Sequence, residues 1–115
     1  MDYSGENMKQ EKHEKQKKQE KFDVFLLTKP PFSPRSKLCL KLAARSGKAR
    51  LYLTGDGVYH LLGGTEQFPK YKIYACKEDL EARAIKPGKE VTVLENFYSD
   101  FIEDIMEHCR HEYTF

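Results

Sequence analysis

Hydrophobic and polar residues form a regular pattern after residue 21. Short apolar or alternating runs of strand length lie at residues 22–28, 49–54, 71–76 and 89–95. Each run is followed by a segment with helical features, so strands and helices alternate along the chain. This alternation predicts an α/β domain with a mostly parallel sheet of four to five strands and helices on both faces.

The first and last helices have the clearest signals. For the first, Ser33 is the expected N-cap, Pro34 the first helical residue and Gly47 the left-handed residue that ends the helix. The last helix is expected over about residues 97–110. Apolar stripes at helical spacing mark both helices: Leu38, Cys39, Leu42 and Ala43 in the first, and Phe97, Phe101, Ile105 and Cys109, with a second row of Tyr98, Ile102 and Met106, in the last.

Two short helices are expected between the middle strands. Asp56 is the predicted N-cap of a segment at 57–62, and a second helix covers residues 77–85. The glycines around the first segment match neither a dinucleotide-binding loop nor a phosphate-binding P-loop, so nucleotide binding is not predicted. The sequence by itself identifies no partner for His60, which is expected at the surface.

Residues 1–21 differ from the rest of the chain. They contain no Leu, Ile, Val or Phe, and six lysines there face five acidic residues. Such a segment cannot bury enough apolar surface to offset its chain entropy, which predicts a disordered or weakly helical charged arm. The folded domain is therefore expected over residues 22–115.

Charge and cysteine content narrow the possible environments. A net charge of +2 does not indicate direct nucleic-acid binding, although the lysines of the arm leave an accessory role at RNA as a weaker hypothesis. No apolar run approaches the roughly 20 residues that span a bilayer, and no signal peptide is recognised. Three cysteines without a CxxC pair do not form a disulfide framework. We expect a cytoplasmic protein with reduced thiols.

The predicted parallel sheet indicates where a functional site should lie. In open sheets of this kind, sites form beyond the carboxyl ends of the strands. Four segments are expected at this edge: 28–33, 54–57, 76–77 and 95–99.

Cys76 lies at this edge, where a strand meets a helix. Unpaired amides at a helix start favour a thiolate, and Lys77 adds a nearby cation. The negative charges of Glu78 and Asp79 disfavour the thiolate. A thiolate there is able to attack a sulfane sulfur and hold it as a persulfide. The alternative is an inert thiol packed under the following helix.

The remaining candidates are weaker. Cys39 shares the apolar stripe of the first helix and is expected in the core. His108, Cys109 and His111 point in different directions on a helix and lack a paired half-site, so no zinc site is predicted. The sequence shows no Ser-His-Asp triad, and no metal or organic cofactor is expected.

Three segments together resemble the DsrE/DsrH-like sulfur-relay family, and within it most closely the TusB/DsrH branch. They are "LYLTGDGVYHLL" (51–62), "YKIYACKEDLEARAI" (71–85) and "EVTVLENFYSDFIEDIMEH" (90–108). The shared features are a strand running into Asp-Gly-Val, a strand followed by a helix of the form Asp-Leu-x-Ala-Arg-(Gly/Ala), and a helix beginning Tyr-x-(Asp/Glu)-Phe. The resemblance covers most of residues 22–110.

This resemblance implies a flavodoxin-like domain in a protein-to-protein sulfur relay, serving tRNA 2-thiouridine formation or sulfur oxidation. Cys76 stands where the sulfur-carrying subunits of the family have their cysteine, with Asp56 ordering the adjoining turn. Many TusB-type chains lack that cysteine, and Cys39 loosely matches a cysteine of DsrH-type chains. The chain is therefore either a persulfide carrier or a non-catalytic structural subunit.

The resemblance also implies partners. They are a sulfur donor, a sulfur acceptor and other subunits of a homo- or hetero-oligomer. Exposed aromatic side chains in 95–101 and 111–115 are the expected docking surfaces, because Tyr113 and Phe115 are costly to leave in water.

Overall fold

A computed structural model describes residues 20–65, 68 and 71–115. Residues 1–19 of the predicted arm therefore lie outside the described residues. The elements are β1 (Phe22–Leu27), α2 (Pro34–Ser46), β2 (Ala49–Leu53), the 3₁₀ segment η1 (Gly55–Gly63), β3 (Lys72–Cys76), α3 (Lys77–Ala82), β4 (Val91–Leu94), α4 (Phe97–His108) and β5 (Cys109–Thr114). No helix among these described residues is long and apolar enough to cross a membrane.

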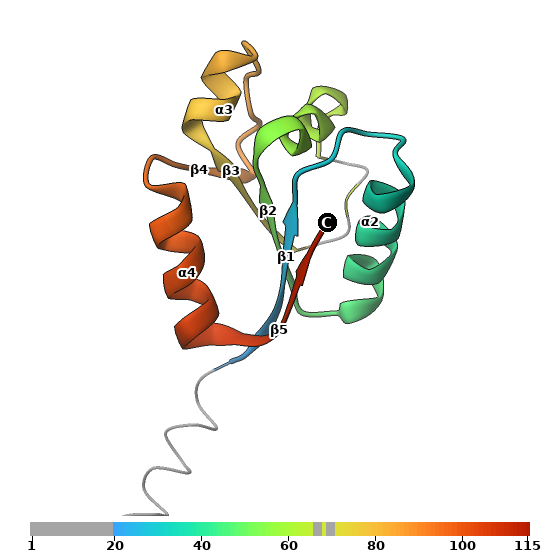
Figure 1. Cartoon of the computed structure of the whole chain (residues 1–115), viewed down its shortest axis with the longest axis vertical. Helices are drawn as coiled ribbons and strands as arrows, with labels where there is room; N and C mark the ends of the chain where they lie inside the picture. The colour runs from blue at the N-terminus through green and yellow to red at the C-terminus, as the bar shows by residue number, and fades with distance from the viewer. Residues whose placement is uncertain (1–19, 66–67, 69–70) are drawn as a thin grey trace, which may run out of the picture.

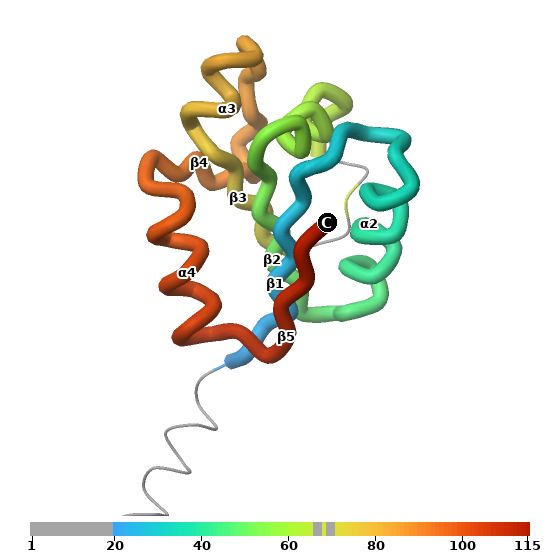
Figure 2. The backbone as a smooth tube through the Cα atoms, in the orientation of Figure 1, coloured from blue at the N-terminus to red at the C-terminus, as the bar shows by residue number. Residues whose placement is uncertain are grey.

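The described strands form one sheet of five parallel strands in the order β4-β3-β2-β1-β5. From β1 the chain moves outward to β4, and α4 then returns it to the other side of β1. Right-handed crossovers in opposite directions place their helices on opposite faces. Figures 1 and 2 show this arrangement, with α2 and α4 on the two sides of the sheet. The predicted small flavodoxin-like α/β fold is confirmed.

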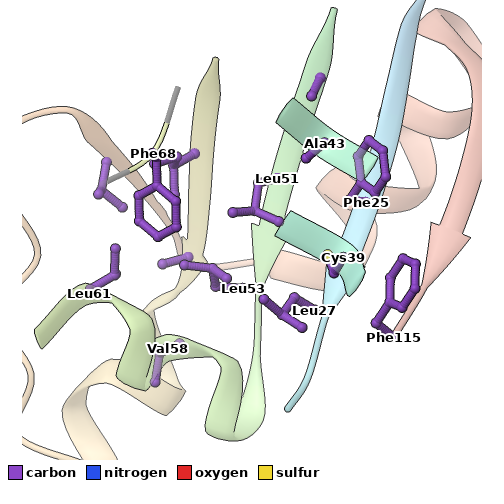
Figure 3. Packing of buried hydrophobic residues seen from close by; sticks show 14 of the residues in the cluster. Phe25, Leu27, Cys39, Ala43, Leu51, Leu53, Val58, Leu61, Phe68 and Phe115 are labelled. Atoms are coloured by element: carbon purple, nitrogen blue, oxygen red, sulfur yellow. The ribbon is translucent and has the colours of Figure 1, made fainter. Parts of the chain in front are cut away.

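Side chains from alternate strand positions fill two cores, one on each face. The larger lies under α2 and η1, where Leu27, Leu51, Leu53 and Val58 are fully buried (Figure 3). The second lies under α4 and contains Val24, Tyr52, Cys76, Phe97 and Phe101. Cys76 is therefore on the α4 face of the sheet.

Helix α2 begins and ends as predicted. The Ser33 hydroxyl accepts a hydrogen bond from the Ser36 amide at 3.1 Å, Pro34 is the first helical residue, and Gly47 is left-handed with φ 76°. Cys39 and Ala43 face the core, but Leu38 is exposed, so its predicted place in the buried stripe is wrong. Leu38 lies one position before Cys39, about 100° around the helix, and this rotation turns it to solvent.

The predicted end of the last helix is also wrong. Helix α4 stops at His108, and Cys109 begins β5, which pairs with β1. The buried carboxylate of Asp23 on β1 anchors this charged edge strand, because Arg110 donates two hydrogen bonds to it at 2.9 and 3.1 Å. A polar strand of this kind lacks the apolar run that marks the other four.

The two aromatic segments expected to be exposed are largely packed inside. Phe97 and Phe101 are buried under α4, and Phe115 is buried beside β1, with the Arg35 guanidinium 5.3 Å from its ring centre. Tyr113 stacks on Phe25 and keeps 39% of its surface exposed. Tyr98 is the aromatic of 95–101 that remains exposed.

Ala84, just after α3, has a left-handed backbone with φ 54°. A side chain there costs about 1–2 kcal/mol, and glycine avoids this cost. The Ala84→Gly variant is therefore expected to be more stable by about 0.5–1 kcal/mol after the larger chain entropy of glycine is counted. Urea unfolding measures this as a higher midpoint with an unchanged slope.

Ala82 provides the matched control, because it is the last residue of α3. Ala82→Gly is expected to lose about 0.5 kcal/mol, since glycine loses more chain entropy than alanine in a helical conformation. Equal effects of the two substitutions would contradict the left-handed strain at Ala84.

Candidate functional site

The candidate site lies at the carboxyl edge of the sheet, where β2, β3 and the start of α4 meet. Three of the four segments expected at this edge come together here: Thr54 follows β2, Cys76 ends β3, and Tyr98 lies in the first turn of α4. The Tyr98 hydroxyl is 3.5 Å from Oγ1 of Thr54. The tertiary fold thus connects residues that are 44 positions apart in the sequence.

Asp79 is the central polar group of this site. Its Oδ2 accepts hydrogen bonds from the Thr54 hydroxyl and from the Gly55 amide, each at 2.7 Å. Burial raises the pKa of this carboxyl, but these bonds, the Cys76 thiol and the Arg83 guanidinium together hold it below its usual value. Asp79 is consequently a fixed negative charge beside the thiol.

Asp56 and Arg83 tie η1 to α3. Arg83 Nη2 donates to Asp56 Oδ1 at 3.0 Å, and Nη1 lies 3.5 Å from Asp79. The predicted N-cap role of Asp56 is wrong, because η1 begins at Gly55 and the N-cap position belongs to Thr54. Asp56 instead orders the turn through Arg83, and two of the three motifs noted in the sequence are joined by this ion pair.

Cys76 occupies the N-cap position of α3 and is only 7% exposed. Burial raises the pKa of its thiol; the Asp79 carboxylate acts in the same direction, and the backbone amides of Asp79 and Glu78 act against both. The isolated chain therefore holds this thiol protonated. Among the described residues, no hydrogen bond or ion pair involves the Lys77 ammonium.

The other two cysteines lie away from this edge of the sheet. Cys39 is fully buried in the larger core, as expected, and burial raises the pKa of its thiol to about 12. Cys109 is half-buried at the start of β5, and burial raises its pKa as well. No cluster of three His, Cys, Asp or Glu side chains suited to a metal ion occurs within the described residues.

The sheet has its topological switch between β1 and β5, where such folds commonly bind ligands. At the carboxyl end of this switch, the Phe115 carbonyl accepts hydrogen bonds from both the amide and the hydroxyl of Thr28. Cys76 lies at the end of β3, two strands from β1. The candidate site is thus separate from the usual ligand crevice.

His60 is buried, which corrects its predicted surface position. Its Nε2 lies 3.1 Å from the Lys29 carbonyl oxygen, and burial lowers its pKa. The His60 ring therefore joins η1 to the loop after β1. Its partner is 31 residues away along the chain, so no local sequence pattern could have predicted this contact.

The Asp79→Asn variant is expected to lower the pKa of the Cys76 thiol, because the neutral amide removes a charge that opposes the thiolate. Burial remains, so the pKa is expected to stay above its ordinary value. The rate of Cys76 alkylation as a function of pH, followed by peptide mass spectrometry, measures the change.

Glu81→Gln supplies the matched control, since Glu81 is an exposed acidic residue of the same helix. Alkylation of Cys76 is expected to accelerate in Asp79→Asn and to stay unchanged in Glu81→Gln. An equal rate in both variants would show that burial alone controls the thiol.

Sequence reasoning located Cys76 and Asp56 and expected Asp79 to oppose a thiolate at Cys76, but it missed the roles of Thr54, Arg83 and Tyr98. Thr54 and Tyr98 do lie in segments expected at the carboxyl edge. Arg83 directly follows α3 and forms an i,i+4 pair with Asp79, and this spacing is a signal that the sequence contains. Their shared link to η1 depends on the packing of α3 against it.

Comparison with known protein families matches residues 29–111 to the family described as "DsrH like protein". The match covers more than half of the chain and includes all the residues of the candidate site. A search of curated proteins found no match.

Proposed function

Because the chain belongs to the DsrH-like family of sulfur-relay proteins, we propose that Cys76 accepts a sulfane sulfur from a donor protein and passes it on as a cysteine persulfide. The position of the thiol supports this proposal. Cys76 ends β3 at the carboxyl edge of the sheet, beside the first amides of α3 and next to a carboxylate that two further hydrogen bonds hold in place. Of the three cysteines, Cys76 is the one at this edge of the sheet.

The transfer is an exchange of thiols and needs no oxidant. The Cys76 sulfur attacks the outer sulfur of the donor persulfide, the donor S–S bond breaks, and a new S–S bond forms on Cys76. The donor leaves as a thiolate and takes the proton that Cys76 gives up. An acceptor thiol later attacks the outer sulfur of the Cys76 persulfide, and the S–S bond on Cys76 breaks. The sulfur is then used in tRNA thiolation or in sulfur oxidation. The transfer takes place in the cytoplasm, where thiols stay reduced.

A second candidate function is that of a non-catalytic subunit of a sulfur-relay oligomer. The 7% exposure of Cys76 and the raised pKa of its thiol favour it, since attack on a donor protein requires an accessible thiolate. In this case Cys76 serves as a small core residue beneath α4.

Incubation of the full chain with inorganic polysulfide, followed by intact-mass measurement, separates the two functions. A carrier is expected to gain sulfur in a form that dithiothreitol removes. The gain should disappear in Cys76→Ser and persist in Cys39→Ser and Cys109→Ser. An unchanged gain in Cys76→Ser, or no gain in the native chain, would reject the carrier and leave the structural subunit.

A further inference from the structure

A hollow of about 610 Å³ lies between the start of α2, the segment η1 and the loop after β1. It is on the face of the sheet opposite Cys76, because α2 and η1 cover the larger core and Cys76 belongs to the core under α4 (Figure 1). Its volume is within the range of roughly 300–1,000 Å³ that is typical of small-molecule sites. The proposed sulfur transfer makes no use of this hollow.

Hydrogen bonds between its walls hold the hollow open. The buried ring of His60 lines it, and Nε2 of this ring donates to the Lys29 carbonyl oxygen at 3.1 Å, which fixes η1 against the loop. On the other side, the Ser33 hydroxyl accepts from the Ser36 amide at 3.1 Å, and the Ser36 hydroxyl donates to the Ser33 carbonyl at 3.0 Å. These bonds fix the loop against α2. Walls that are already ordered lose little freedom when a ligand binds, so binding costs less.

The lining combines an apolar wall with a positive charge. Among the described residues that line the hollow, Leu40, Tyr59 and Leu62 supply apolar surface, and none is acidic. Burial lowers the pKa of His60, which leaves the exposed Lys37 as the charged group of this described lining. Within the part of the chain that the structure describes, Lys37 forms no ion pair. Such a lining fits a small molecule with an apolar body and one negative group.

Phe32 gives a second, independent sign of a ligand. Its side chain lines the hollow, yet the residue is 87% exposed and its backbone is left-handed with φ 72°. A bulky residue rarely adopts this conformation, and burial of the ring within this chain does not offset the strain. A flat ring bound in the hollow would cover Phe32 and stack on it or on Tyr59. The two aromatic side chains therefore favour an aromatic body over an aliphatic chain.

We propose that this hollow binds a small aromatic carboxylic acid. The ring of the ligand lies against Phe32, Tyr59 and Leu40, and its carboxylate pairs with the Lys37 ammonium. Because Lys37 is exposed, the ion pair adds only a modest part of the affinity and mainly selects an acid over a neutral molecule. This binding goes beyond the proposed sulfur transfer and does not depend on Cys76.

Isothermal titration of the full chain with 2-naphthoate tests the proposal. The native chain is expected to bind one equivalent with a dissociation constant of about 100 μM, a value typical of a ligand of this size in an open site. Lys37→Gln is expected to weaken binding about fivefold, because it removes the counter-charge of the carboxylate. Lys41→Gln is the matched control, since Lys41 is an exposed cation of the same helix that does not line the hollow.

The uncharged 2-naphthamide separates the ion pair from the apolar contacts. It is expected to bind the native chain about fivefold more weakly than 2-naphthoate does, and to bind Lys37→Gln and the native chain equally. Equal affinity of Lys37→Gln and Lys41→Gln for 2-naphthoate would overturn the assignment of the carboxylate to Lys37.

Phe32→Asn tests the aromatic contact. Asparagine tolerates a left-handed backbone better than phenylalanine does, so circular dichroism should show an unchanged fold. Loss of the ring is expected to weaken binding of 2-naphthoate about tenfold. Full affinity in Phe32→Asn, or tighter binding of decanoate than of 2-naphthoate to the native chain, would overturn the choice of an aromatic ligand. Absence of saturable 2-naphthoate binding would overturn the site itself.

Discussion

Replacing Asp104 by Asn is expected to destabilise the fold by about 3 kcal/mol, because it leaves the largely buried Arg50 side chain without its counter-charge. Asp104 is a buried residue of α4, and its carboxylate accepts hydrogen bonds from Arg50 at 2.5 Å and from the Tyr52 hydroxyl at 2.6 Å. His108 lies 3.0 Å away on the next turn. These contacts join α4 to β2, and the substitution should lower the melting temperature by more than about 10 °C.

Urea unfolding of Asp104→Asn beside Glu103→Gln measures this loss. Glu103 is the exposed neighbour of Asp104 on the same helix, and its substitution is expected to change the free energy of unfolding by less than about 0.5 kcal/mol. A loss of under about 1 kcal/mol in Asp104→Asn would show that packing of Phe97 and Phe101 alone holds α4 in place.

The free energy of unfolding that Asp104→Asn loses should also depend on pH, and this dependence provides a second measurement. Burial raises the pKa of Asp104, but hydrogen bonds from Tyr52 and Arg50 outweigh it and hold the pKa below its usual value. A carboxyl with a lowered folded pKa contributes stability above its unfolded pKa of about 3.9, and this contribution disappears as pH falls through the folded value. The difference between native and Asp104→Asn should therefore shrink as the pH is lowered below about 5.

Replacing Gly57 by Ala is expected to cost about 3 kcal/mol, at the upper end of the usual range for an overpacked core. A Cβ at this position would lie 2.1 Å from the Leu27 carbonyl oxygen and 2.9 Å from its carbon. Leu27 belongs to strand β1, which is paired on both sides, so it cannot move away easily. Displacement of η1 should also weaken the bond from the Gly55 amide to Asp79 and change the pH profile of Cys76 alkylation.

Gly88→Ala is the matched control for this prediction. A Cβ at Gly88 would meet Oε1 of Glu90 at 3.2 Å, at the end of a flexible and exposed side chain. Its effect on the free energy of unfolding is expected to stay below about 0.5 kcal/mol. Similar losses in Gly57→Ala and Gly88→Ala would contradict the close approach of η1 to β1.

Both large effects arise from contacts that join separate elements: α4 with β2, and η1 with β1. In the sequence, Asp104 is one of several acidic residues of a predicted helix, and Gly57 is part of a predicted turn. Helix periodicity placed Phe97 and Phe101 correctly on one row of α4, but it did not say which row faces the sheet. The predicted exposure of those aromatics failed for this reason.

The amino-acid sequence alone was enough to predict four strands, the caps of α2, the edge of the sheet that holds Cys76, and the family. These properties depend on neighbours a few residues apart, where backbone conformation and hydrophobic period are set. Packing between distant segments decided the rest: the charged strand β5, the buried ring of His60, and the carboxylate of Asp79 beside a covered thiol. Burial and ionisation depend on what surrounds a group in space, and those surroundings exist only once the sheet and its helices have come together.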